Sequence, residues 1–193
     1  MKRFLLSLSI LFVAEICAAG EIHSVLVHPL FKGFYSCTEH WAGQLPGLGD
    51  ALGSDCVVEK LTTEEGRTWL RAFKGNGYRN ADWYGWMQEV LSPCTCEVVK
   101  ININPVVNEP GIIGKGVASF ILLKNADGVM FMLAHVANPK VHVGESVREG
   151  QVLAVIGNNG QARLPHIHIG AWRDKEPLQL RFDQNHMGEA DEH

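Results

Sequence analysis

The sequence lacks an excess of positive charge, an internal repeat and any low-complexity tract. Its 17 Lys and Arg face 21 Asp and Glu, for a formal net charge of −4 at pH 7, so a broad basic surface for nucleic acid is not expected. Its one long apolar stretch, residues 4–18, is too short for a membrane span. What is present, 46% hydrophobic and 20% charged residues in a chain of 193, is typical of one globular domain.

The N-terminus predicts a signal peptide over residues 1–19. Lys2 and Arg3 precede the apolar stretch, and Ala18 and Ala19 supply the small residues of a cleavage site before Gly20. An uncleaved N-terminal anchor is the alternative. The chain is therefore expected to be exported, to the periplasm or the exterior, with no membrane contact beyond the signal peptide.

Four cysteines follow the signal peptide: Cys37, Cys56, Cys94 and Cys96. In an oxidising compartment four thiols favour disulfides, and three connectivities are possible. Because Cys94 and Cys96 are so close in the sequence, a bond between them would be strained. We expect each of them to pair with Cys37 or Cys56.

Short runs of β-forming residues separated by turns predict a mostly β fold with antiparallel sheets. A hairpin is expected at residues 125–128, where Asp-Gly stands at the tip. Residues 20–88, with a Gly-rich loop at 40–56 and an insertion at 61–87, are expected to join the same domain. The β-rich core is predicted over 89–175 and a polar, fraying tail over 176–193. The expected core strands span 89–93, 96–105, 118–125, 129–136, 152–157 and 166–172.

His166 and His168 stand one residue apart inside the last of these runs. Side chains two residues apart on a strand point to the same face, so the two imidazoles project away from the face of Ile167 and Ile169. With a carboxylate or a third imidazole they would make a metal site with an open position. Two hydrogen-bonded histidines on a half-exposed strand are the plainer alternative.

The surroundings of this pair resemble the lysostaphin-like zinc endopeptidases of the peptidase family M23 type, which cleave peptidoglycan peptides. The resemblance covers about residues 86 to 172 and is most specific in its last third. It implies a barrel-sandwich β fold of that type with loop insertions. The matching residues are Val143-Gly144-Glu145, Val147, Gly150-Gln151, Gly157-Asn158-Asn159-Gly160 and Pro165-His166-Ile167-His168.

The resemblance also implies a set of zinc ligands. His168 matches the second His of the family's His-x-His, and Asp55 matches the Asp of its His-x-x-x-Asp. The position four before Asp55 is Ala51, so the family's first ligand is missing. Either His40 or Asp50, both in the Gly-rich loop, replaces it, or the site binds metal weakly or not at all. His40 is the better zinc donor of the two.

His135 and His166 match the family's two non-ligand histidines and are expected to act in catalysis. The family's Tyr two residues before the first of them is Leu133 here. The implied function is an exported zinc metalloendopeptidase that cuts peptidoglycan cross-links.

The alternative is a catalytically degenerate relative that binds peptidoglycan or regulates another cell-wall hydrolase. A lipoyl-like carrier is disfavoured because no suitable lysine follows residues 143–156. Arg163 either contacts substrate or is a solvated loop residue, and Trp83, Tyr84 and Trp86 either line a groove or, for at least one of them, cover the core.

Overall fold

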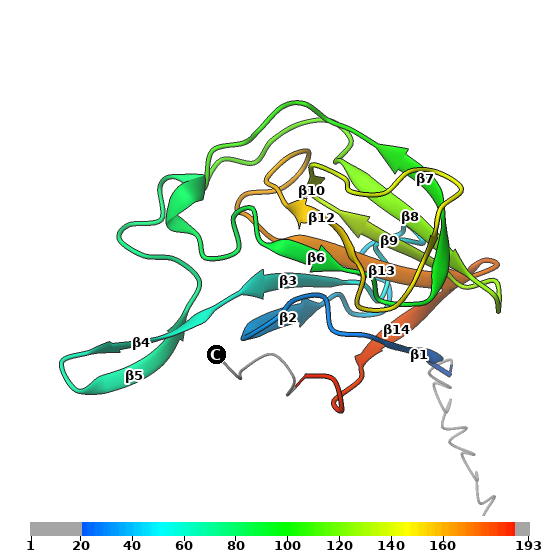
Figure 1. Ribbon diagram of the computed structural model, residues 1–193, viewed down its shortest axis with the longest axis horizontal. Helices are drawn as coiled ribbons and strands as arrows, with labels where there is room; N and C mark the ends of the chain where they lie inside the picture. The colour runs from blue at the N-terminus through cyan, green and yellow to red at the C-terminus, as the bar shows by residue number, and fades with distance from the viewer. Residues whose placement is uncertain (1–20, 188–193) are drawn as a thin grey trace, which may run out of the picture.

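The computed structural model describes residues 21–187, and the predicted signal peptide lies outside them. In this part of the chain the fold is nearly all β, which confirms the predicted fold class (Figure 1). Its elements are β1 (Ser24–Val27), β2 (Tyr35–Glu39), β3 (Ser54–Val58), β4 (Lys60–Glu64), β5 (Arg67–Arg71), the 3-10 helix η1 (Asn80–Asp82), β6 (Glu89–Leu91), β7 (Cys96–Asn102), β8 (Phe120–Asn125), β9 (Met130–Ala134), β10 (Val136–Ala137), β11 (Ser146–Val147), β12 (Val152–Ile156), β13 (Ile167–Arg173) and β14 (Glu176–Phe182).

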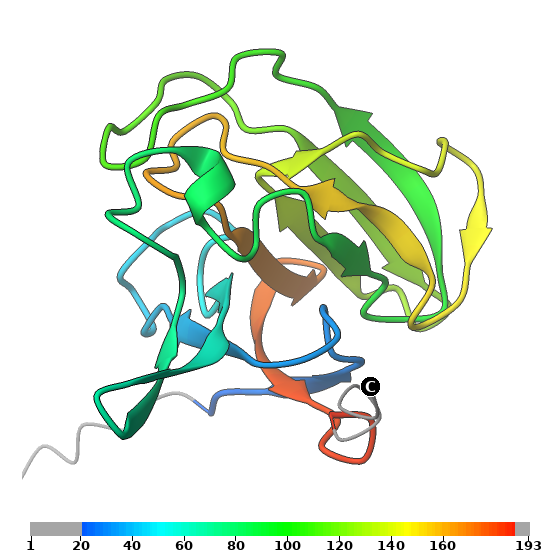
Figure 2. The same ribbon diagram turned by 60° about the vertical axis from the view of Figure 1, so that its left-hand side comes forward.

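One large sheet organises the molecule, in the order β1-β14-β13-β9-β8-β7-β11. β3 pairs with β13 beside β14, and β2 pairs with β3. The pairs are antiparallel except β1 with β14, which run parallel. The sheet curls strongly, as Figure 2 shows. β8 and β9 form the predicted hairpin, whose turn is held by the Asn125 side chain accepting from the backbone N–H groups of Asp127 and Val129.

A smaller antiparallel sheet of β10, β12 and β6 covers one face of the large sheet. The core lies between them. Val90, Leu153 and Ile156 come from the small sheet, and Phe131 and Ile167 from the large one, all at 1% exposure or less. Burial of these side chains is the main stabilising contribution to the fold.

Strand alternation sends every second residue of the large sheet to the opposite face. On β9, Phe131 and Leu133 enter the core, while Met132 and Ala134 face a groove on the other side. On β13, Ile167 and Ile169 are fully buried in the core, and His168 faces that same groove. The period of two therefore separates the functional face from the core, as expected for His166 and His168.

The disulfides differ from the expectation. Cys37 bonds to Cys56 and Cys94 bonds to Cys96. Cys37 and Cys56 are direct cross-strand partners on β2 and β3, with Cα atoms 4.1 Å apart. The Cα atoms of Cys94 and Cys96 are 5.5 Å apart, within the usual range for a disulfide, because the chain bends at residues 93–95 just before β7. Proximity in the sequence therefore did not prevent this bond.

Two other segments are more ordered than the sequence indicates. β1 to β5 lie within residues 20–88, and the expected insertion contains the β4–β5 hairpin, which projects from the body in Figure 1. β14 occupies the start of the segment predicted as a polar tail, since Leu178 and Leu180 alternate into the core. Within residues 21–187, no helix has the length and apolar character needed to cross a membrane.

Candidate metal centre and groove

A groove of about 720 Å3 runs over the face of the large sheet opposite the core. Its floor is built by alternate residues of three strands: Asp55 from β3, His168 from β13 and Met132 from β9. Because β3 and β9 both pair with β13, the sheet register brings these side chains together. His40, which follows β2, enters the groove from the side.

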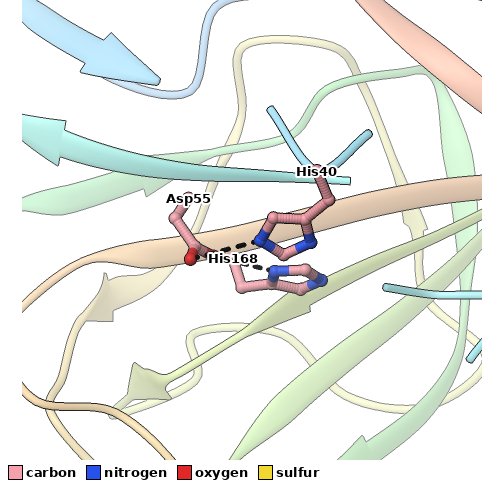
Figure 3. A group of neighbouring side chains, drawn as sticks. All are labelled: His40, Asp55 and His168. Carbon is pink, nitrogen blue, oxygen red and sulfur yellow. Dashed lines mark hydrogen bonds and ion pairs between the residues drawn. The ribbon is translucent and has the colours of Figure 1, made fainter. Parts of the chain in front are cut away.

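His40, Asp55 and His168 form a compact group of possible metal ligands (Figure 3). The Asp55 carboxylate lies 2.9 Å from His168 Nδ1 and 3.4 Å from His40 Nε2. The two imidazole rings stack with centroids 5.3 Å apart. One ligand atom from each residue lies within 4.8 Å of the others. Two imidazoles and one carboxylate at this separation could hold a divalent cation.

The outer nitrogen of each imidazole is held by a backbone carbonyl of the Gly-rich loop. His40 Nδ1–H donates to the Asp50 carbonyl at 2.9 Å, and His168 Nε2–H donates to the Gly49 carbonyl at 2.8 Å. A carbonyl oxygen can only accept, so these bonds fix the proton on the outer nitrogen. The inner nitrogen of each ring is then a lone pair that faces a carboxylate.

That arrangement calls for a cation beside Asp55. A neutral imidazole has one proton to donate, yet His168 stands between two acceptors, the Gly49 carbonyl and the Asp55 carboxylate. The same is true of His40. A second proton on each ring, or one metal ion shared by both rings, satisfies the inner nitrogens. The donor set therefore fits a divalent metal ion such as zinc, which binds neutral imidazole and ionised carboxylate.

The electrostatics agree with this geometry. Burial alone would raise the pKa of Asp55, but the neighbouring imidazoles of His166 and His168, which become positively charged when protonated, outweigh burial and hold the pKa well below its usual range. Burial would lower the pKa of His168, yet its bonds to Asp55 and Gly49 outweigh burial and raise it, so that without a metal ion a second proton on Nδ1 is favoured at the place where a cation would bind. At neutral pH Asp55 is therefore ionised and attracts positive charge to this point of the groove.

His135 and His166 form a second pair of imidazoles beside this group. Their ring centroids are 4.5 Å apart, and His166 Nε2 lies 3.6 Å from the Asp55 carboxylate. His135 Nδ1–H donates to the Asn159 carbonyl at 2.8 Å, and His166 Nδ1–H donates to the Leu164 carbonyl at 2.9 Å. Each Nε2 is then left without a proton. Burial lowers the pKa of His135 to about 3, so this ring is neutral at physiological pH.

An unusual backbone angle directs His135 into the groove. Strand alternation from Phe131 and Leu133 would send residue 135 into the core. His135 instead has a φ of 64°, in the left-handed region that non-glycine residues seldom adopt. The chain turns there between β9 and β10, which returns Val136 to the core and leaves His135 on the groove side. Conformations of this kind cluster at functional sites.

The structure thus brings together all five predicted site residues. Of the two candidates for the missing ligand, His40 lies beside Asp55, whereas the Asp50 carboxylate is 3.6 Å from the opposite, outer nitrogen of His168. Only His40 completes the group. The five residues are His40, Asp55, His135, His166 and His168, and their assignment to ligand or catalytic roles stays a prediction.

The groove walls differ in part from the expectation. Arg163 lines the groove, and its contact with substrate stays a prediction, whereas Trp83, Tyr84 and Trp86 do not line this groove and Trp86 lines a separate, smaller pocket. Trp83 packs on Phe73 instead. The wall that the sequence did not indicate is the segment 103–119 between β7 and β8, where Ile113 and Val117 are at least 50% exposed. In the sequence, the signal that could have indicated this wall is the presence of Ile and Val residues in a segment otherwise rich in turn-forming residues.

Part of the chain is similar in sequence to a known protein family. The sequence model of peptidase family M23 matches residues 86–180, which confirms the resemblance seen in the sequence. The matched segment contains His135, His166 and His168 but neither His40 nor Asp55. Among curated proteins none matches this chain significantly.

Several solved structures are similar at low sequence identity. The catalytic domain of the prophage-encoded M23 protein EnpA from Enterococcus faecalis is 14% identical, with a TM-score of 0.49, over 78% of this chain and 92% of that chain. The catalytic domain of lysostaphin from Staphylococcus simulans is 18% identical, with a TM-score of 0.42, over 74% and 79%. A chain of the SpoIIIAH–SpoIIQ complex is 16% identical, with a TM-score of 0.48, over 79% and 95%.

Proposed function

We propose, from the match of residues 86–180 to the model of peptidase family M23, that the chain is an exported zinc metalloendopeptidase that hydrolyses peptide bonds in peptidoglycan cross-links. One observation carries the proposal. His40, Asp55 and His168 converge at the floor of an open groove, with the unprotonated nitrogens of both rings turned toward one carboxylate.

His40 Nε2, the Asp55 carboxylate and His168 Nδ1 are the atoms that would hold zinc. Bound there, zinc polarises a substrate carbonyl and lowers the pKa of water toward ~7. The three protein ligands leave a position free for water or substrate, which is the arrangement of a catalytic rather than a structural zinc site.

The two remaining imidazoles handle protons and developing charge. His135 is neutral at physiological pH and its Nε2 is free, so it can accept a hydrogen bond from the attacking water and orient it, while its lowered pKa makes it a weak base. His166 Nε2 is likewise free, and in its protonated form it can donate to the oxygen of the tetrahedral intermediate. Both rings are fixed by backbone carbonyls. Preorganised groups of this kind are typically worth ~10²–10⁴-fold in rate.

The setting of the groove supports an exported enzyme acting on a polymer. The groove of about 720 Å3 lies over the outer face of the large sheet, which gives room for a segment of a long substrate. Both pairs of cysteines outside the predicted signal peptide form disulfides, which persist in oxidising compartments. Together with the predicted signal peptide, they support action in the periplasm or outside the cell, where peptidoglycan is found.

A catalytically degenerate relative is the second candidate, and Leu133 favours it. The family's Tyr at this position would add a hydroxyl, whereas Leu133 is fully buried in the core and contributes nothing to the groove. Such a protein would bind peptidoglycan through the same groove without cutting it.

Zinc analysis and digestion assays on the purified, oxidised protein separate the two candidates. The zinc-loaded protein is incubated with isolated peptidoglycan, and newly released amino groups and shortened cross-linked fragments are measured. We expect one zinc per chain and cleavage that a chelator abolishes, with His168→Ala inactive and His142→Ala, an exposed histidine, unaffected. Binding of peptidoglycan without any cleavage would show that the protein is the catalytically degenerate relative.

A further inference from the structure

The Gly-rich loop approaches strand β13 closely where it meets the site. Its turn is held by its own backbone, since Asp50 N–H and Ala51 N–H both donate to the Gly47 carbonyl, at 3.0 and 2.8 Å. The carbonyls of Gly49 and Asp50 are then aimed at His168 and His40. One short turn thus supplies the outer partner of both imidazoles.

Glycine 170 makes this approach possible. Gly170 follows two residues after His168 on β13, is buried, and faces the loop. A Cβ atom built at Gly170 would overlap the carbonyl oxygen of Gly49, the acceptor of the His168 hydrogen bond. The obstruction is backbone, which cannot turn aside as a flexible side chain can. Any residue other than glycine must therefore move the Gly49 carbonyl.

We propose that Gly170 is a positioning residue, which seats the Gly49–Asp50 turn so that its two carbonyls set the tautomers of His168 and His40 for metal binding. This inference rests on the proposed function. Gly170 touches neither substrate nor metal. It acts through the Gly49 carbonyl, which keeps the His168 proton on Nε2 and leaves Nδ1 as a lone pair toward Asp55.

The expected size of the effect follows from other metal sites. Hydrogen-bond partners of metal-bound histidines fix the tautomer and ring orientation, and their loss weakens metal affinity on the order of 10- to 100-fold. Gly170→Ala should weaken zinc binding by a similar factor. The ligand atoms themselves are unchanged in this variant, so a smaller change would mean that the carbonyls contribute little.

The test compares zinc affinity in the wild type, Gly170→Ala and a matched control. Gly85→Ala is the control, because Gly85 is also buried but its Cβ would meet only Ile156 and Val58, at 3.3 Å or more. Affinity is measured by competition with a chromophoric chelator on the oxidised full chain. Nitrogen NMR of the imidazoles supplies a second measurement: in the zinc-loaded wild type we expect the protons on His168 Nε2 and His40 Nδ1, protected from exchange.

The outcomes separate this inference from the proposed function. Weaker zinc binding and a rapidly exchanging His168 Nε2–H in Gly170→Ala, with Gly85→Ala like the wild type, support it. Equal zinc affinity in Gly170→Ala and wild type overturns it while leaving the enzyme proposal intact. A wild type that binds no zinc overturns both.

A second variant covers the case in which Gly170→Ala does not fold. Gly53→Ala places a Cβ 3.0 Å from His168 Cε1 and 3.1 Å from the Asp50 carbonyl oxygen, so it presses on the same turn more gently. It should weaken zinc binding in the same direction. Unchanged affinity in a folded Gly53→Ala would then count against the role of the turn.

Discussion

Asp55 and His168 lie directly opposite each other on the antiparallel strands β3 and β13, and the carboxylate of one is 2.9 Å from Nδ1 of the other. Residues paired in this way have their Cβ atoms about 5 Å apart. The backbone ladder therefore sets the distance between these two side chains before any ligand binds. The third member of the group, His40, depends on a loop instead.

The dependence on His40 gives the first prediction. His40→Ala should lose far more zinc affinity than the roughly 10- to 100-fold typical of an outer hydrogen-bond partner, because it removes a ligand atom. Zinc per chain after dialysis against buffer measures this, with His142→Ala as the control. If His40→Ala retained stoichiometric zinc, another residue would have to be the third ligand.

Variants of the non-ligand histidines should separate catalysis from metal binding. In His166→Ala we expect kcat to fall by about 10²–10⁴-fold, the usual contribution of a proton-transfer group, while one zinc per chain is retained. For His135 the suitable variant is Asn, which tolerates the left-handed backbone at this position. Loss of zinc together with activity in either variant would instead identify that residue as a ligand.

The pKa of His135 predicts how the metal-free protein responds to acid. His135 titrates at about 3 in the folded state because of burial, against about 6.5 in the unfolded chain. Between these values the unfolded state binds more protons, so the free energy of unfolding should fall as pH falls below about 6.5, by up to ~1.4 kcal/mol per pH unit.

Denaturant unfolding of wild type and His135→Asn at pH 7 and pH 4.5 measures this contribution. The wild type should lose more stability than the variant over that interval. His168, whose raised pKa gives a contribution that is complete below about 6.5 and is lost as pH rises above that value, is present in both proteins, so its contribution largely cancels in the comparison. Parallel losses in the two proteins would show that His135 is not kept neutral by the fold.

The disulfide between Cys37 and Cys56 predicts a link between oxidation and the site. It joins β2, which leads into His40, to β3, which carries Asp55. Its loop spans 19 residues, for which the chain-entropy model gives about 3 kcal/mol of stabilisation. The double variant Cys37→Ala/Cys56→Ala should lose about this much stability and bind zinc more weakly.

Cys94→Ala/Cys96→Ala is the matched control for that experiment. This bond closes a loop with a sequence separation of only 2, and neither cysteine lines the groove, so its removal should change zinc affinity little. Equal effects of the two double variants on zinc binding would contradict a specific role for the Cys37–Cys56 bond.

The sequence predicted those parts of the protein that follow from local periodicity. The alternation around Ile167 and Ile169 placed His166 and His168 on one face, and the Asp-Gly turn located the β8–β9 hairpin. The family motif then predicted Asp55 and His135. These signals come from neighbouring residues or from a sequence motif, so they can be recognised without knowledge of the tertiary structure.

Other features depend on contacts between distant segments. The choice of His40 over Asp50 follows from the way the Gly-rich loop folds onto β13, and no spacing in the sequence encodes that approach. The cysteine pairing depends on the register of β2 against β3. β14 was missed because its apolar residues, Leu178 and Leu180, are few, and its pairing with β1 and β13 depends on contacts between distant segments.

The position of β13 near the C-terminal end of the described chain determines when the three possible ligands can come together. His168 comes from the next-to-last strand, whereas His40 and Asp55 come from the first third of the sequence. A ribosome-bound chain that has not yet released residues 167–173 lacks both the second imidazole and the strand on which β3 pairs. The three possible ligands therefore cannot come together in a nascent chain, or in a chain that ends before β13, so zinc binding at this point should require almost the whole sequence.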